Sequence, residues 1–386
     1  MVFPSLTFKP DILRATEPDI SFALYKKVDL SCTQKIINYN CIELVAHNKS
    51  IAEATLLAEA GRLNRFDAIL DKAYQQPYRE LTLVSDVPQF LAETKVIKLA
   101  IMRIALEIAQ GKDEEALARW GNETNFLLKQ AKNSYGLIDK MAAIAGLNRY
   151  QYLLADYISY HPNASRGNAR KIMAMLVPFN KEAVTLQFSF ENEATSLARS
   201  MISVKQMTGS LMLDSTNTPD SWVIDKLFRP FLDPNATANA ISEYNLEWSH
   251  IATLEENDLQ SAIKEKKLKL KSAISESIPS LVYSYHNPVG KILVNVSKQQ
   301  GVQPLRYLWR SNNTIANNKL LVFAIDLLSR AATPAEQIQQ EINIHKAELK
   351  HPYTAELPVW NGEGRSLSYP IPEEFKEDAR LLVVKL

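Results

Sequence analysis

Glycine is the residue type that most constrains the fold of this chain. Only 11 of its 386 residues are glycine, which is about 3% against an average of about 7% in globular proteins. Tight β-hairpins, phosphate-binding loops and barrel corners need residues that tolerate positive φ, and glycine supplies most of them. A chain this poor in glycine can build few such features, so we predict a mainly α-helical fold.

The charge balance bears on the class of partner. The chain carries 44 Lys and Arg against 43 Asp and Glu, which gives a formal net charge of +1. Proteins that bind nucleic acid usually carry a basic excess, because they neutralise phosphates with Lys and Arg. We therefore expect no nucleic-acid partner. The 46% hydrophobic content is ordinary for a folded protein, and the length allows two or three domains.

The first 165 residues show the pattern of helical hairpins. Alanine and leucine recur at three- and four-residue steps, and glycines interrupt the pattern. We expect three pairs, at 51–74, 96–120 and 137–158, with turns at Gly61, Gly111 and Gly146. The pairs resemble tetratricopeptide-type packing without its constant period. Residues 1–165 are therefore predicted to form an irregular α-hairpin domain that offers a face to another protein.

Residues 166–350 are predicted to form a second helical domain. A loop is expected at 161–168, where Pro, Asn, Ser and Gly gather. A long helix is expected at 181–207. Residues 233–237 read as the start of the next helix, with Asp233 or Asn235 as its cap. Further helices are expected at 239–254, 258–274, 315–331 and 334–349.

Composition changes after residue 350. Residues 357–369 read as two short strands joined at Asn361-Gly362, a dipeptide typical of β-hairpin turns. Residues 379–386 are apolar and are expected to form a terminal strand. Residues 351–386 are therefore predicted to be a small β-containing tail.

The chain has two cysteines, Cys32 and Cys41, which lie close together in the sequence. Such a pair is a disulfide candidate in an oxidising compartment such as the periplasm. The alternative is that both are small buried core residues. Without a nearby histidine pair, the two thiols do not form a zinc-binding pattern.

One segment combines aromatic and polar residues densely enough to be a candidate partner or ligand site. Its residues are Tyr283, Tyr285, His286, Asn287, Pro288, Gly290 and Lys291. The structural alternative is a buried turn, in which proline and glycine set the bend and the asparagine bonds local backbone.

No catalytic motif is found. The chain lacks a Walker loop, a dinucleotide-binding glycine loop and a nucleophile elbow. His345 and His351 are too far apart for the i, i+4 zinc pattern, so no metal and no cofactor are expected. Glu276-Ser277 matches the Glu-Ser pair of lytic transglycosylases, but the glycine-rich run that follows it in those enzymes is absent.

Three segments together resemble a poorly characterised family of proteobacterial envelope proteins. They are Phe231–Thr237, Tyr285–Lys291 and the tail from His351. The resemblance implies an N-terminal membrane anchor outside the given sequence, a long helical body and a pseudopilin-like tail. Where the tail of that family has an acidic or amide residue and a glycine, this chain has His351 and Ala355. In its Asn- and Lys-rich character the chain is also similar to accessory envelope proteins of Acinetobacter-type type VI secretion systems.

These observations favour a non-enzymatic scaffold or assembly factor that binds other proteins. It is expected in the periplasm, or anchored in the inner membrane and facing the periplasm, among the proteins of a membrane-associated machine. Two alternatives stay open. One is a cell-wall hydrolase that uses Glu276, and the other is a cytosolic tetratricopeptide-type binding module.

Overall fold

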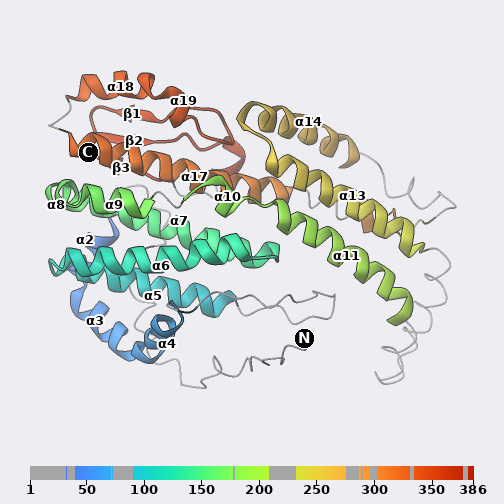
Figure 1. Cartoon of the computed structure of the whole chain (residues 1–386), viewed down its shortest axis with the longest axis horizontal. Helices are drawn as coiled ribbons and strands as arrows, with labels where there is room; N and C mark the ends of the chain where they lie inside the picture. Colours follow the sequence, from blue (N-terminus) through green and yellow to red (C-terminus); the bar gives the residue numbers. More distant parts are fainter. Residues whose placement is uncertain are drawn as a thin grey trace, which may run out of the picture.

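The computed structural model confirms a mainly α-helical protein with a small C-terminal sheet (Figure 1). It describes residues 32, 40–70, 72, 90–176, 179–207, 232–274, 287, 290–291, 293–295, 302–330, 334–376 and 381–386.

The first half of the chain forms a bundle of helices. Its described helices are α2 (Cys41–His47), α3 (Lys49–Ala58), α4 (Ala60–Leu70), α5 (Phe90–Ala109), α6 (Asp113–Asn133), α7 (Leu137–Tyr160), α8 (Pro162–Gly167) and α9 (Ala169–Leu176). The predicted turn at Gly111 is confirmed. Its φ of +74° lies in the left-handed region that glycine favours, and it joins α5 to α6.

The predicted turn at Gly146 is wrong, because residues 137–160 form one continuous helix. A Cβ atom on Gly146 would lie 2.9 Å from Leu127 Cδ1 and 3.1 Å from Ile97 Cδ1. The glycine therefore serves close packing of α7 against α5 and α6 and does not end a helix. Apolar residues around much of α7 are buried, as expected for a helix inside a bundle.

Two other sequence expectations are corrected in this half. Helices α3 and α4 separate at Glu59, and Gly61 lies within α4, since one exposed glycine costs a helix only about 1 kcal/mol. The expected loop at 161–168 contains the short helix α8. Pro162 occupies its first turn, where the missing N–H group is not needed.

The second half contains α10 (Lys181–Val184), α11 (Gln187–Met207), α13 (Pro234–Thr253), α14 (Glu256–Ile274) and α17 (Val302–Ser329), followed by α18 (Ala335–Ile344) and α19 (Lys346–Leu349). The long helix expected at 181–207 is divided, because Thr185 ends α10 before α11 begins.

Helices α11 and α13 pack along each other and form what we call the arm. Along the arm, the Ser242 hydroxyl donates to the Ala194 carbonyl over 3.3 Å, and the Ser249 hydroxyl donates to the Glu191 carboxylate over 2.9 Å. The two helices run away from the bundle together, and α14 lies beside α13 (Figure 1). Lys266 of α14 fixes this neighbour, because its ammonium group lies 5.0 Å from the centre of the Tyr244 ring of α13.

Helix α17 packs on α7 through polar contacts as well as apolar ones. The Gln151 amide of α7 donates to the Thr314 carbonyl over 2.9 Å, and the Ser311 hydroxyl donates to the Val184 carbonyl over 2.7 Å. All four residues joined by these two bonds are buried, and Val184 belongs to α10. Each such bond supplies a partner for a buried polar group, so together they select one orientation of α17 on the bundle.

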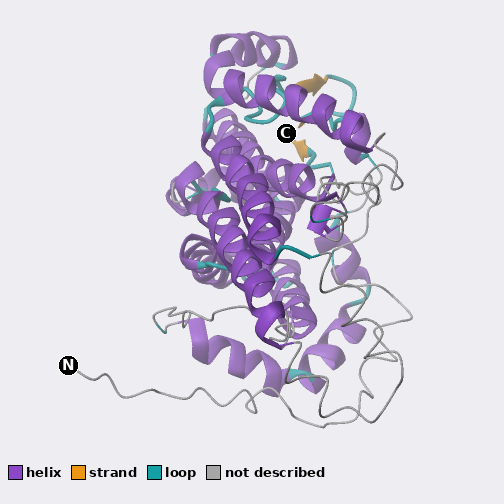
Figure 2. Cartoon of the chain, turned by 90° about the vertical axis from the view of Figure 1, so that its right-hand side faces the viewer, coloured by secondary structure: helices purple, strands orange, loops and turns teal. Residues whose placement is uncertain are grey.

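The tail forms the predicted hairpin and terminal strand. The turn is not at Asn361-Gly362 as predicted, because Asn361 pairs with Ser366 and residues 362–365 form the connection. Strand β1 (Val359–Asn361) pairs antiparallel with β2 (Ser366–Ser368), and β2 pairs with β3 (Val384–Lys385). A single 3₁₀ turn, η3 (Glu373–Phe375), lies between β2 and β3. The sheet lies at one end of the molecule, and α3 and α4 lie at the opposite end (Figures 1 and 2).

Candidate functional site

The described residues of the candidate partner segment lie at the N-terminal end of α13, which is the end of the arm away from α14. Of that segment, Asn287, Gly290 and Lys291 are described. Tyr283, Tyr285, His286 and Pro288 lie outside the described residues. The sequence-predicted segment therefore meets the sequence-predicted helix start at Asp233.

Asn287 joins these two parts of the chain. Its Oδ1 accepts hydrogen bonds from the Asp233 N–H over 2.8 Å and from the Gly290 N–H over 3.1 Å. Its Nδ2 donates to the Thr237 hydroxyl oxygen over 3.0 Å. Asp233 in turn caps α13, because its Oδ1 accepts from two N–H groups of the first turn at 3.0 Å. We call these residues the asparagine knot.

The asparagine knot uses its polar atoms internally. Asn287 adopts a φ of +55°, a left-handed conformation that asparagine tolerates better than most residues. Gly290 is buried within the knot, whereas Lys291 is exposed. The knot therefore positions the candidate partner segment at the start of α13. Among the described residues of that segment, Lys291 is exposed to solvent.

Gly290 is expected to tolerate no larger residue. A Cβ atom there would lie 2.0 Å from the Thr237 hydroxyl oxygen and 2.2 Å from Asn287 Oδ1. We expect Gly290→Ala to displace Asn287 and to destabilise the arm by about 1–3 kcal/mol, the range for overpacking a filled site. Hydrogen exchange of the first turn of α13 measures this loss.

Gly167 provides the matched control, because nothing lies within 4 Å of a Cβ atom built on it. Gly167→Ala should leave exchange in α13 unchanged. Equal exchange in α13 for Gly290→Ala and the unsubstituted protein would contradict the knot as described.

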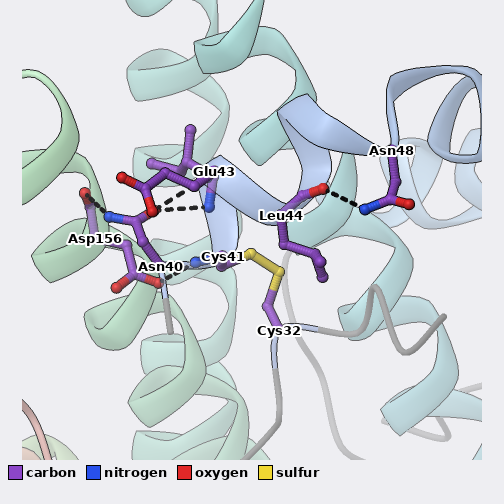
Figure 3. Close-up of a disulfide and its surroundings, with 8 residues drawn as sticks. Cys32, Asn40, Cys41, Glu43, Leu44, Asn48 and Asp156 are labelled. Atoms are coloured by element: carbon purple, nitrogen blue, oxygen red, sulfur yellow. Dashed lines mark hydrogen bonds between the residues drawn. A yellow bond between two sulfur atoms is a disulfide. The ribbon is translucent and has the colours of Figure 1, made fainter. Parts of the chain in front are cut away.

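The cysteine pair forms a disulfide at the start of α2. Cys32 and Cys41 are bonded, their Cα atoms lie 5.2 Å apart, and both residues are buried (Figure 3). Asp156 of α7 lies beside the bond. Its carboxylate accepts from the Cys41 N–H over 3.0 Å, and its carbonyl accepts from the Asn40 amide over 3.0 Å. Asn40 also caps α2, so the disulfide, the cap and α7 are tied together.

A buried charged cluster that the sequence reasoning missed lies between α4, α5, α6 and α7. Arg103 donates two hydrogen bonds to Asp67, over 2.8 and 2.7 Å, and one to Glu123 over 2.9 Å. Glu123 is 0% exposed and also accepts from the Tyr150 hydroxyl. We call these four residues the buried ion cluster.

The ionisation of this cluster follows from its burial. Burial raises the pKa of Glu123 to about 7, and the hydrogen bonds from Tyr150 and Arg103 oppose the rise. The hydrogen bond from Arg103 lowers the pKa of the more exposed Asp67. The cluster links four helices, and Arg103 is the residue that bridges the two carboxylates.

A signal for Glu123 exists in the sequence. It lies three residues after Trp120 and four before Leu127, so it occupies the buried and mainly apolar stripe of α6. A carboxylate on an apolar stripe requires a buried partner. The partner could not be named from the sequence, because Arg103 is on another helix.

The remaining sequence predictions concern catalysis, metal binding and the membrane. Glu276 and Ser277 lie outside the described residues. In the part of the chain that is described, no three His, Cys, Asp or Glu side chains come together as a metal site would require. None of the described helices is both long enough and apolar enough to cross a membrane.

Comparison with known proteins gives no match. Neither a protein-family model nor a curated protein nor a solved structure is similar to this chain.

Proposed function

We propose that this protein is a non-enzymatic, extracytoplasmic scaffold that binds another protein through the arm. The observation that carries the proposal is the arm itself, a pair of helices that pack on each other and extend away from the bundle (Figure 1). A helical pair of this kind offers a long face to a groove or to a helix of a partner. At its base the arm contacts α7 of the bundle.

Apolar side chains on the arm support the proposal. Phe188 near the start of α11 is 60% exposed, and Leu246 of α13 is 49% exposed. A partner that covered these side chains would gain about 25 cal/mol for each Å² of apolar surface removed from water. These two residues are therefore the positions at which we expect contact.

The disulfide supports a location outside the cytoplasm. Disulfides persist in oxidising compartments and are rare in the cytosol, where thiols are kept reduced. The bond between Cys32 and Cys41 is buried and is held by Asp156. We therefore favour the periplasm, or the periplasmic face of an inner membrane, over a cytosolic binding module.

The family resemblance suggests the kind of partner. Two of the segments that carry it, around Asp233 and around Asn287, meet in the asparagine knot at the tip of the arm. We propose that the partner belongs to an envelope machine, for which a type VI secretion system is the resemblance-based candidate.

Site-directed crosslinking in cells of the source organism tests the partner. A benzophenone amino acid is placed at Phe188 or at Leu246. The control position is Leu57, which is 79% exposed and belongs to α3 of the bundle, away from the arm (Figure 1). We expect one protein to be captured from both arm positions and not from Leu57. No adduct, or the same adducts from all three positions, would refute binding through the arm.

The state of the thiols tests the compartment. Protein from the same cells is denatured and alkylated, with and without prior reduction, and its mass is measured. We expect two additions only after reduction, because Cys32 and Cys41 are the only cysteines of the chain. Two additions without reduction would place the protein among cytosolic binding modules.

A further inference from the structure

The tail begins at a histidine that acts as a hydrogen-bond acceptor. His351 is 1% exposed, and its Nδ1 accepts from the Tyr353 N–H over 3.1 Å and from the Thr354 N–H over 3.3 Å. A ring nitrogen accepts only when it carries no proton, so this contact requires neutral imidazole. We call residues 351–356 the histidine turn.

Backbone bonds close the histidine turn. The His351 N–H donates to the Glu356 carbonyl over 2.9 Å, and the Ala355 N–H donates to the His351 carbonyl over 2.8 Å. Ala355 has a φ of +52°, the left-handed conformation that glycine usually supplies. An Asp or Asn oxygen would accept the same two N–H groups in a turn of this kind.

The surroundings of His351 disfavour a positive charge. The Lys319 ammonium of α17 donates to the neighbouring Lys350 carbonyl over 3.0 Å, and Glu256 of α14 lies 3.4 Å from that ammonium group. The ring of Tyr369 in β2 meets the imidazole edge to face at 5.2 Å. Burial, and then the charge of Lys319, lower the pKa of His351 to about 3.

The histidine turn joins α19 to the part of the tail that packs on the bundle. The Tyr369 hydroxyl donates to the Leu349 carbonyl over 2.5 Å, next to the turn. Phe375 packs on Tyr353 of the turn, with ring centres 5.9 Å apart, and on Trp309 of α17, at 5.0 Å. Opening the turn would therefore disturb the contacts that hold residues 357–376 on α17.

We propose that His351 is a pH-sensitive latch: protonation of its imidazole opens the histidine turn and releases the tail from α17, while the helical bundle stays folded. Protonated Nδ1 becomes a donor that faces two N–H donors, so both hydrogen bonds are lost. The new charge would also lie in a buried site near Lys319.

The pH window follows from the two states. The pKa of His351 is about 3 in the closed tail and returns to the ordinary value of 6.5 once the tail opens. Between these values the open state binds more protons, so the closed tail loses stability as pH falls below 6.5. Within the window, the opening constant rises about tenfold for each unit of pH.

Hydrogen exchange with mass spectrometry on the full chain tests the latch. Protection factors of β1 and β2 are followed from pH 7 to pH 4.5, with α6 as the internal reference. We expect protection in the strands to fall about 50-fold between pH 6.5 and pH 4.5, while α6 stays protected. Loss of protection in the strands and in α6 at the same pH, or none in the strands, would overturn the proposal.

Two variants separate the latch from general acid sensitivity. His351→Asn keeps a side-chain acceptor and does not titrate, so its strands should stay protected to pH 4.5. His345→Asn is the control, because His345 is partly exposed and pairs with Glu348 on the surface, and it should behave like the unsubstituted protein. A loss in His351→Asn equal to that in the unsubstituted protein would refute the role of His351.

A direct titration keeps the test decisive if His351→Asn fails to fold. In the unsubstituted protein, the carbon-13 signal of labelled His351 should stay that of neutral imidazole while the strands are protected, and should become that of imidazolium as protection is lost. An imidazole that takes up its proton near pH 6.5 with the strands still protected would overturn the proposal.

Discussion

Replacement of Arg103 with alanine is expected to destabilise the bundle by about 3–5 kcal/mol at pH 8, the range for removing one partner of a buried ion pair. Arg103 is the cation of the buried ion cluster and bonds to both Asp67 and Glu123. Asp67 is partly exposed and can be solvated by water, but the side chain of Glu123 is 0% exposed. The loss arises mainly from Glu123, which keeps only the Tyr150 hydroxyl as its partner.

The effect of this substitution should depend on pH. In the unsubstituted protein the pKa of Glu123 is already raised by burial, from 4.5 to about 7. The folded state therefore binds more protons than the unfolded state between these values, and Glu123 contributes less stability as pH rises through them. Without Arg103 the pKa of Glu123 rises further, so the destabilisation should be smaller at pH 5 by up to about 1.4 kcal/mol.

Chemical denaturation followed by circular dichroism at pH 5 and pH 8 measures both effects. Arg330→Ala is the control, because Arg330 pairs with Asp326 and Glu341 on the surface, where such pairs contribute about 1 kcal/mol or less. The double variant Arg103→Met with Glu123→Gln removes both buried charges and should be more stable than Arg103→Ala. Equal losses for Arg103→Ala and Arg330→Ala would show that the cluster is not buried as described.

Trp120→Ala is expected to cost about 3–5 kcal/mol, the range for truncating a large core aromatic residue. Trp120 of α6 is 1% exposed and stacks on Phe179, with ring centres 6.4 Å apart. Its indole N–H also donates to the Tyr150 carbonyl of α7 over 2.9 Å. The side chain thus fills the core and fixes α6 on α7 beside the buried ion cluster.

Trp360 of β1 is the matched control for this prediction. The same change there removes a side chain that is only partly buried, so Trp360→Ala should cost clearly less in thermal and chemical denaturation. Trp120→Phe should fall between the two, since it retains an aromatic ring and loses the hydrogen bond to Tyr150. A loss for Trp120→Ala no larger than that for Trp360→Ala would contradict the assigned core.

Several elements could be predicted because their signals are local. The scarcity of glycine indicated a helical fold, and Asp233 before Pro234 indicated the start of α13. Asn361-Gly362 indicated the hairpin of the tail. In the two local cases the deciding residues lie within a few positions of the element they specify, so a short stretch of sequence is enough to predict that element.

Gly146 shows where local reasoning failed. A glycine within a helical pattern can mark a turn or a close contact between helices, and the local sequence is compatible with both. Leu127 and Ile97, which approach Gly146, come from other helices. The close contact of α5 and α6 with Gly146 favours a continuous α7, because a turn at this position would disrupt the packing of α7 on both helices.

The functional regions were decided by contacts across long stretches of sequence. The sequence by itself determined the helical fold class, the tail hairpin and the segment around Asn287 as a place of interest. Only the tertiary structure joined Asn287 to Asp233, 54 residues away, Asn40 to Asp156, 116 residues away, and Tyr150 to Glu123, 27 residues away. A buried polar group needs a partner, and helix packing chooses which one, because it alone brings distant side chains within hydrogen-bonding distance.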